Sequence, residues 1–286
     1  MTSEPVLLFD SAPPEEHAPE LYRPIGIAEP IHTLDAFDEA AHERYNRDGY
    51  LAIEDAFTPQ EVRDALAGMD DLVMGRREGF TGIMFESKAR ELLPTLTLEN
   101  RLDAVRKFMC FVAYEPRLNA MAEHPGLKRV LERILGEAPV MFQDMALVKP
   151  PKIGREKPWH QDQAYFDYPL GTRVVGVWIA LDEATVENGC MRVLPGQHLA
   201  GPRLHFQRRD WQICDKEMKG TQPVAVPLRP GGLMLFDGLL PHGTPNNFSP
   251  LRRRAVQFHY RNESAQKTTA AERLSIFGSE GKDVSC

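Results

Sequence analysis

In the first half of the chain, apolar residues recur among polar ones with the spacing of a helix. Apolar residues three or four positions apart predict helices over residues 35–47, 58–73, 116–122 and 126–135. The second helix has a complete start signal, because Thr58 suits the N-cap, Pro59 suits the first helical position and Glu61 can complete a capping box. Gly49 and Gly136 follow two of the predicted helices and are expected to end them.

A different pattern begins after residue 138, where short apolar runs are separated by turns that contain Pro or Gly. In addition to an earlier strand over residues 50–53, these runs predict strands over residues 140–148, 174–181, 190–194, 224–228, 233–236 and 255–260. No helical pattern lies between the later runs, which favours an antiparallel sandwich or a jelly-roll barrel. The predicted fold is therefore α+β and mainly β, with N-terminal helices that buttress a jelly-roll core.

The chain is expected to form one domain with an N-terminal arm. Residues 1–35 are rich in Pro and Glu and show little periodicity, which predicts an irregular arm without chemistry of its own. Residues 36–286 are long enough for a single large domain. Within it, residues 199–222 interrupt the strands with charged and aromatic residues, and such an insertion is often a lid over a binding site.

Composition narrows the class of protein. With 34 basic and 41 acidic residues, the formal net charge is −7, so no basic field predicts nucleic-acid binding. No apolar run reaches transmembrane length and the first residues do not resemble a signal peptide, so a cytoplasmic protein without membrane association is expected. The composition indicates no particular oligomeric state. The four cysteines lack metal-ligand spacing and are expected to be reduced thiols: Cys110, Cys190, Cys214 and Cys286.

Candidate chemistry is concentrated in residues 159–166. His160 and Asp162 are separated by one residue, so on a β-strand their side chains would lie on the same face. His242 follows a predicted strand, and a neighbouring strand could deliver it to the same place. Two imidazoles and one carboxylate form the facial triad that binds non-haem Fe(II) and leaves coordination positions open. A single His-x-Asp pair also occurs by chance on surfaces and in buried hydrogen bonds, so further support is needed.

That support comes first from three adjacent arginines, Arg252 to Arg254, which precede the last predicted strand. Alternate residues of a strand face opposite ways, so one arginine should point inward and require an anionic partner, such as the far carboxylate of a dicarboxylate cosubstrate. A solvated basic cluster is the alternative. Lys149, before Pro150, is interpreted as a solvated strand end.

Two predicted strands carry residues suited to a pocket. Gly176, Trp178 and Ala180 share one strand face, where the small residues either leave room for a bound molecule or flank an ordinary core tryptophan. Gln143 and Met145 share a face of another strand and combine an amide with a soft apolar group. The other histidines, including His198, are given no role beyond hydrogen bonding: His17, His32, His42, His124, His205 and His259.

Together these segments resemble the phytanoyl-CoA dioxygenase family of Fe(II)/2-oxoglutarate-dependent oxygenases. The matching motifs are Trp-His-Gln-Asp-Gln-Ala-Tyr-Phe (159–166), Asn-Gly-Cys-Met-Arg-Val-Leu-Pro-Gly-Gln-His (188–198) and Pro-Gly-Gly-Leu-Met-Leu-Phe-Asp-Gly-Leu-Leu-Pro-His-Gly-Thr (230–244). The resemblance covers roughly residues 36–262. It implies that the jelly roll is a double-stranded β-helix of the cupin-like kind.

The resemblance also assigns roles to single residues. It implies that the iron ligands are His160, Asp162 and His242. It implies that Arg253 binds the far carboxylate of 2-oxoglutarate and that the cosubstrate also contacts Trp178, Met145, Thr244 and Lys107. Some related halogenases carry a small residue in place of the carboxylate ligand, so the presence of Asp162 favours hydroxylation.

The expected function is hydroxylation of a small-molecule metabolite, with Fe(II), 2-oxoglutarate and O2 as cofactors and succinate and CO2 as products. The same iron centre could instead catalyse desaturation, epoxidation or cyclisation. An alternative of another class is a catalytically silent jelly-roll protein that binds or senses a ligand. The presence of all three ligands and of Arg253 argues against that alternative.

The substrate is less constrained by the sequence. Gln143 could hydrogen-bond to it, and Tyr165, Phe166 and Tyr168 could wall the pocket, although packing at the barrel rim explains these aromatic residues equally well. Three arginines of the expected lid could meet an anionic group of the substrate or form a solvated surface: Arg203, Arg208 and Arg209.

Overall fold

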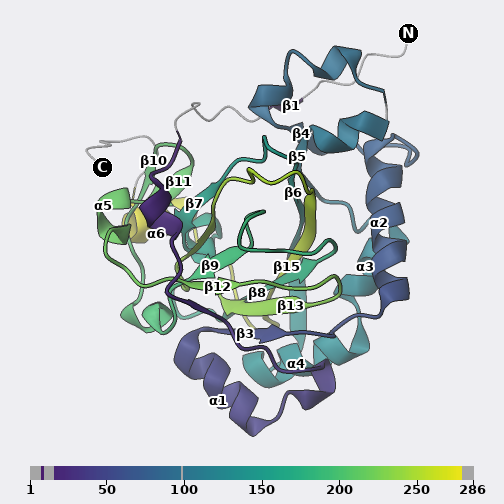
Figure 1. Cartoon of the computed structure of the whole chain (residues 1–286). Coiled ribbons are helices and arrows are strands. Elements are labelled where there is room, and N and C mark those ends of the chain that lie inside the picture. Colours follow the sequence, from purple (N-terminus) through teal and green to yellow (C-terminus); the bar gives the residue numbers. More distant parts are fainter. Residues whose placement is uncertain (1–7, 10–15, 98, 279–286) are drawn as a thin grey trace.

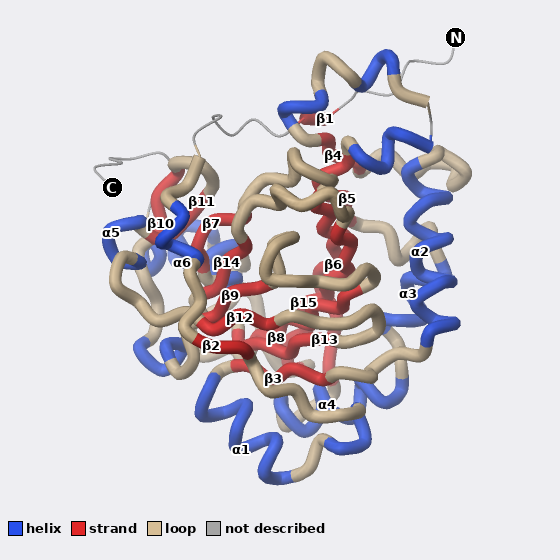
Figure 2. The backbone as a smooth tube through the Cα atoms, viewed as in Figure 1, coloured by secondary structure: helices blue, strands red, loops and turns tan. Residues whose placement is uncertain are grey.

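Two β-sheets form the core of the protein. The computed structural model of the chain describes residues 8–9, 16–97 and 99–278. Cys286, most of the first fifteen residues of the predicted arm and the last eight residues of the predicted domain lie outside the described residues. The large sheet has the strand order β1-β4-β5-β6-β15-β8-β13-β3, and the small sheet has the order β2-β12-β9-β14-β7 (Figure 2).

The strands of the large sheet are β1 (Leu8–Phe9), β3 (Tyr50–Ile53), β4 (Ile83–Phe85), β5 (Val105–Met109), β6 (Pro139–Lys149), β8 (Val174–Ala180), β13 (Leu233–Asp237) and β15 (Arg253–Asn262). Those of the small sheet are β2 (Gly26–Ile27), β7 (Lys157–His160), β9 (Met191–Val193), β12 (Val224–Val226) and β14 (His242–Thr244). All seven strands expected from the sequence are present, with ends that differ by at most two residues. This arrangement confirms the predicted jelly-roll core.

Four helices cover the outer face of the large sheet (Figure 1): α1 (Glu39–Asp48), α2 (Pro59–Val73), α3 (Pro116–Ala122) and α4 (Pro125–Leu135). Successive side chains of β8 point to opposite faces of the large sheet, which explains how it packs on both sides. Val175, Val177 and Ile179 pack in the core under the helices. Trp178 and Ala180 face the small sheet. Burial of these apolar residues stabilises the two layers.

The helix signals in the sequence are mostly confirmed. Thr58 and Glu61 form the predicted capping box, and Gly49 and Gly136 end their helices in the left-handed region. The first helix begins later than predicted, at Glu39, because the preceding Asp38 side chain accepts the Ala41 amide hydrogen and caps it.

The described part of the N-terminal arm is more ordered than the sequence suggested. Strand β2 pairs with β12, and the Tyr22 ring stacks on Trp159 with the ring centroids 5.6 Å apart. The Trp159 indole also donates to the Leu21 carbonyl at 2.9 Å. The arm therefore supports the segment that carries His160 from behind. The division into an arm and one domain remains a prediction.

The segment predicted as a lid forms a hairpin of β10 (His205–Gln207) and β11 (Trp211–Ile213), followed by α5 (Asp215–Met218). Together with the C-terminal helix α6 (Ala270–Phe277), it lies beside β7, on the side of the molecule opposite α2 and α3 (Figure 1). Within the described part of the chain, no helix has the length and apolar character needed to cross a membrane.

Candidate active site

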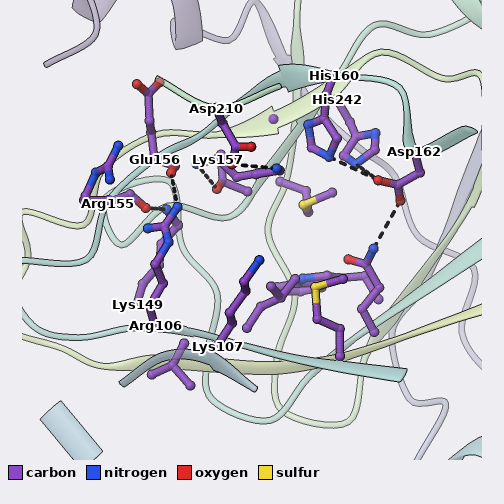
Figure 3. A pocket seen from close by; sticks show the side chains of 18 of the residues that line it. Arg106, Lys107, Lys149, Arg155, Glu156, Lys157, His160, Asp162, Asp210 and His242 are labelled. Carbon is purple, nitrogen blue, oxygen red and sulfur yellow. Dashed lines mark hydrogen bonds and ion pairs between the residues drawn. The ribbon is translucent and has the colours of Figure 1, made fainter. Parts of the chain in front are cut away.

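His160, Asp162 and His242 converge at one buried point between the sheets (Figure 3). The Nε2 atoms of His160 and His242 lie 3.1 and 3.6 Å from the same oxygen of Asp162, Oδ1. One potential ligand atom from each residue lies within 4.8 Å of the other two. Two imidazoles and one carboxylate in this arrangement suit a divalent transition metal such as Fe(II).

The two histidines lie on neighbouring strands, as the sequence suggested, but Asp162 does not lie on a strand. His160 is the last residue of β7, and His242 is its partner at the start of β14. Asp162 begins a 3-10 helix (Asp162–Tyr165) and is not part of the strand. The expectation that His160 and Asp162 share a strand face was therefore wrong, although the turn after His160 still brings their side chains together.

Backbone carbonyls orient both imidazoles. His160 Nδ1 lies 2.7 Å from the Pro158 carbonyl oxygen, and His242 Nδ1 lies 2.9 Å from that of Leu240. Because a carbonyl oxygen only accepts, each Nδ1 carries a hydrogen, which leaves each Nε2 as the nitrogen available to a metal. This is the tautomer that a metal-binding histidine needs.

The electrostatics of the cluster also suit a cation. Burial alone would raise the pKa of Asp162, but the nearby imidazoles of His242, His259 and His160 hold this pKa well below its usual value. Burial, reinforced by His160, lowers the pKa of His242 to about 3. The site therefore contains a carboxylate and a neutral imidazole at neutral pH, which are the forms that bind metal.

His259 and Gln257 are site residues that the sequence analysis missed. Both lie on β15, and both approach the second oxygen of Asp162, Oδ2, with His259 Nε2 at 2.6 Å and Gln257 Nε2 at 3.1 Å. The spacing of two between them, and of four between Gln257 and Arg253, places all three on one strand face. This periodicity was the available signal, but it becomes specific only when β15 is known to lie beside Asp162.

The cavity next to the triad contains every other residue that the family resemblance implied. Its lining includes the five expected cosubstrate contacts, Lys107, Met145, Trp178, Thr244 and Arg253. It also includes the three expected substrate contacts, Gln143, Tyr165 and Phe166. Tyr168 does not line it among the described residues, because its ring packs on Phe142 and its hydroxyl accepts from Arg261.

Arg253 is the inward-pointing residue of the three adjacent arginines. Its side chain is buried, its guanidinium carbon lies 5.2 Å from the centre of the Trp178 ring, and its Nε and Nη1 have no hydrogen-bond partner among the described residues. Burial lowers its pKa to about 10. Arg252 and Arg254 instead form ion pairs with Asp103 and Asp182. A buried guanidinium with unpartnered N–H groups at a cavity wall fits an anionic ligand.

Two predictions about charged side chains were wrong. Lys149 is not a solvated strand end: it is buried, its ammonium group donates to the Arg155 carbonyl, and burial lowers its pKa. Arg209 neither lines the cavity beside the triad nor forms a wet surface, because it is buried and paired with Glu156 and Asp215. Local sequence gave no sign of either partnership.

The small residues beside Trp178 do not all leave space for a ligand. The Phe236 ring fills the place next to Gly176, where an added Cβ atom would lie 2.2 Å from that ring. Phe236 in turn contacts His242, with ring centroids 4.7 Å apart. Gly176 thus supports the wall behind the triad, whereas Trp178 lines the cavity.

Comparison with known proteins adds to this geometry. The family model described as Phytanoyl-CoA dioxygenase (PhyH) matches residues 45–255. The phytanoyl-CoA dioxygenase domain-containing protein 1 of Danio rerio is 33% identical over 156 residues, which cover 51% of this chain and 53% of that relative. The chain thus spans only about half the length of this curated relative.

Two solved structures share the fold. The epimerase SnoN from nogalamycin biosynthesis, in complex with Fe3+, α-ketoglutarate and nogalamycin RO, aligns with a TM-score of 0.65 at 20% identity, over 86% of this chain and 93% of that protein. EvdO2 from Micromonospora carbonacea var. aurantiaca, complexed with 2-oxoglutarate, aligns with a TM-score of 0.62 at 25% identity, over 86% and 96%. Together with the His-Asp-His cluster, these similarities support iron, 2-oxoglutarate and O2 as the cofactors of an oxygenase site.

Proposed function

This chain belongs to the phytanoyl-CoA dioxygenase family, and we propose that it is an Fe(II)/2-oxoglutarate-dependent dioxygenase that hydroxylates a small-molecule metabolite. One observation carries the proposal: a buried His-Asp-His cluster and a buried arginine with unpartnered N–H groups line the same cavity. The first is a set of metal ligands, and the second is a binding group for the far carboxylate of a dicarboxylate.

Each residue then has a defined task. His160, Asp162 and His242 would hold the iron, and Arg253 would bind the far carboxylate of 2-oxoglutarate through its unpartnered N–H groups. The rest of the cosubstrate pocket would be formed by Trp178, Met145, Thr244 and Lys107. The bound iron would couple O2 reduction to decarboxylation of 2-oxoglutarate into succinate and CO2 and to oxidation of the substrate. The protein supplies the ligands and a cavity that orients the cosubstrate and the substrate.

Hydroxylation is favoured because Asp162 keeps a carboxylate at the ligand position, which disfavours binding of a halide there. Desaturation, epoxidation or cyclisation remain the alternative outcomes of the same centre, and SnoN, an epimerase, has a similar fold. The mass of the product separates hydroxylation and epoxidation, which each add one oxygen atom, from desaturation and ring closure, which remove two hydrogens, and the NMR spectrum of the product then separates an alcohol from an epoxide.

The substrate is proposed to be a small molecule with an acidic group. Among the described residues that line the cavity, six are Lys or Arg and only three are Asp or Glu. Two of the three carboxylates are engaged within the protein, Glu156 by Arg209 and Asp210 by Lys157. Figure 3 shows Lys107 pointing into the cavity below the triad. Gln143, whose Oε1 has no partner among the described residues, would accept a hydrogen bond from the substrate between the walls formed by Tyr165 and Phe166.

Release of succinate from 2-oxoglutarate tests the proposal. The reconstituted protein should produce succinate with Fe(II) and O2, and His242→Ala should produce none. A panel of small carboxylic acids, each paired with its primary amide, should then raise the rate only for acids. Equal amounts of succinate from the wild type and His242→Ala would support the alternative of a catalytically silent binding or sensor protein. Equal stimulation by acids and amides would contradict the proposal that the substrate has an acidic group.

A further inference from the structure

The second oxygen of Asp162 is held by two hydrogen-bond donors from one strand. His259 Nε2 and Gln257 Nε2 approach Oδ2 at 2.6 and 3.1 Å, and the two nitrogens lie 3.2 Å from each other. Oδ1 is the oxygen that faces His160 and His242. The two oxygens of the carboxylate therefore have different partners: Oδ1 faces the proposed metal position, and Oδ2 accepts hydrogen bonds from β15.

We propose that His259 and Gln257 are positioning residues that restrict Asp162 to a single metal-ligating oxygen. This inference rests on the proposed function, because it assumes that the triad binds iron. A carboxylate whose second oxygen already accepts two hydrogen bonds has little capacity left to chelate the metal with both oxygens. One-oxygen ligation leaves more of the coordination sphere open to a chelating cosubstrate and to O2.

The position of β15 in the large sheet holds His259 and Gln257 firmly in place. The strand pairs with β6 on one side and β8 on the other, so it is central in the large sheet. Arg253, Gln257 and His259 share its inner face, whereas Tyr260 points outward and donates its hydroxyl hydrogen to the Ala122 carbonyl at 2.7 Å. One strand therefore carries both the proposed anchor for 2-oxoglutarate and the groups that orient the carboxylate ligand.

The surroundings of His259 favour this role over a purely structural one. Its ring is fully buried and packs against aromatic rings, with centroid distances of 4.8 Å to Phe166, 6.0 Å to Phe142 and 6.3 Å to Phe236. Its Nδ1 has no hydrogen-bond partner among the described residues. An apolar residue would fill this aromatic cage without a buried unpartnered nitrogen, so the contact with Asp162 is the interaction that only the imidazole provides.

Anaerobic titration with Co(II) tests the inference without turnover, because the visible spectrum of Co(II) reports its coordination number. We expect His259→Phe and Gln257→Leu to bind Co(II) about 10–100-fold more weakly than the wild type and to change the shape of the spectrum. His259→Gln keeps an N–H donor and should restore much of both properties. The matched control is Tyr260→Phe, which removes a buried hydrogen bond from the opposite face of the same strand and should leave Co(II) affinity and spectrum unchanged.

The outcomes separate the inference from the proposed function. If the wild type binds Co(II) and folded His259→Phe and Gln257→Leu bind it with the same affinity and spectrum, the inference is wrong and the proposed function stands. A similar change in Tyr260→Phe would also overturn the inference, because the effect would then come from the stability of the strand. If the wild type binds no Co(II), both the proposed function and the inference fail.

Discussion

His242 and His160 are direct partners in the antiparallel pair of β14 and β7, and their ring centroids are 4.2 Å apart. They come from distant parts of the chain, so the register of two short strands assembles the site. The Phe236 ring packs against His242, and it occupies the space that the missing side chain of Gly176 leaves free. The geometry of the proposed metal ligands therefore depends on packing in the large sheet.

Gly176→Ala should disturb this wall. The added methyl group would overlap the Phe236 ring, so we expect a loss of about 1–3 kcal/mol in the free energy of unfolding and weaker metal binding through displacement of His242. Gly171→Ala is the control, because a Cβ atom there meets nothing within 4 Å. Urea unfolding and Co(II) titration measure the two effects. If Gly176→Ala were destabilised but bound metal with unchanged affinity, the packing of Phe236 would have no effect on the position of His242.

Arg253→Met should separate stability from cosubstrate binding. Removing a buried guanidinium with unpartnered N–H groups should leave the stability of the ligand-free protein unchanged or raise it. Binding of 2-oxoglutarate to the metal-loaded protein should weaken by about 2–5 kcal/mol. Arg252→Met, which removes an ion pair with Asp103 away from the cavity, should leave that affinity unchanged. Thermal unfolding and calorimetric titration measure both quantities, and an unaltered affinity in Arg253→Met would exclude the anchor.

The sequence specified the local features of this fold and the motif-based part of the site. Helix caps such as Thr58 and Gly136 depend on neighbouring residues, so their signals are readable in order along the chain. His160, Asp162, His242 and Arg253 were proposed from their residue types and their positions on predicted strands, and the family resemblance then assigned their roles. Strand β5 was missed because Arg106 and Lys107, which line the cavity, interrupt its apolar pattern.

The roles that remained hidden are those created by contacts between distant segments. His259 is an unremarkable strand residue until the sheet places it beside Asp162. Arg209 follows Arg208 in a polar stretch, and only the fold reveals that it is buried between Glu156 and Asp215. Neither partnership has a fixed sequence spacing, so no local pattern could indicate it.

Arg209→Met should destabilise the protein without acting on the substrate directly. It would leave the buried Glu156 carboxylate without its main cationic partner, for which we expect a loss of about 3–5 kcal/mol in the free energy of unfolding. Arg203→Met is the matched control from the same segment, because its 3.8 Å contact with Glu217 is partly exposed and should contribute only about 0–1 kcal/mol. Equal stabilities of the two variants in urea would contradict the assignment of Arg209 as a structural residue.

The attachment of the β10–β11 hairpin should weaken in acid. Burial alone would raise the pKa of Asp210, but the ion pair with Lys157, at 2.7 Å, lowers it below its usual value. Because the folded pKa is the lower one, the pair stabilises the folded protein above the unfolded pKa of about 3.9, and this contribution is lost as the pH falls toward the folded pKa. Asp210→Asn should thus be less stable than the wild type at pH 7, and the difference should shrink below about pH 4. A difference in urea midpoint that does not change with pH would count against this account.

The central claim is that one cavity binds iron through the triad and 2-oxoglutarate through Arg253. Anaerobic titration of the metal-free protein with Fe(II) and 2-oxoglutarate, followed by visible absorption, tests it most directly, because the chelate has a weak charge-transfer band. The wild type should develop this band, Arg253→Ala should need much more 2-oxoglutarate to reach it, and Asp162→Ala should weaken or abolish it. The absence of a band in folded wild-type protein would contradict the account.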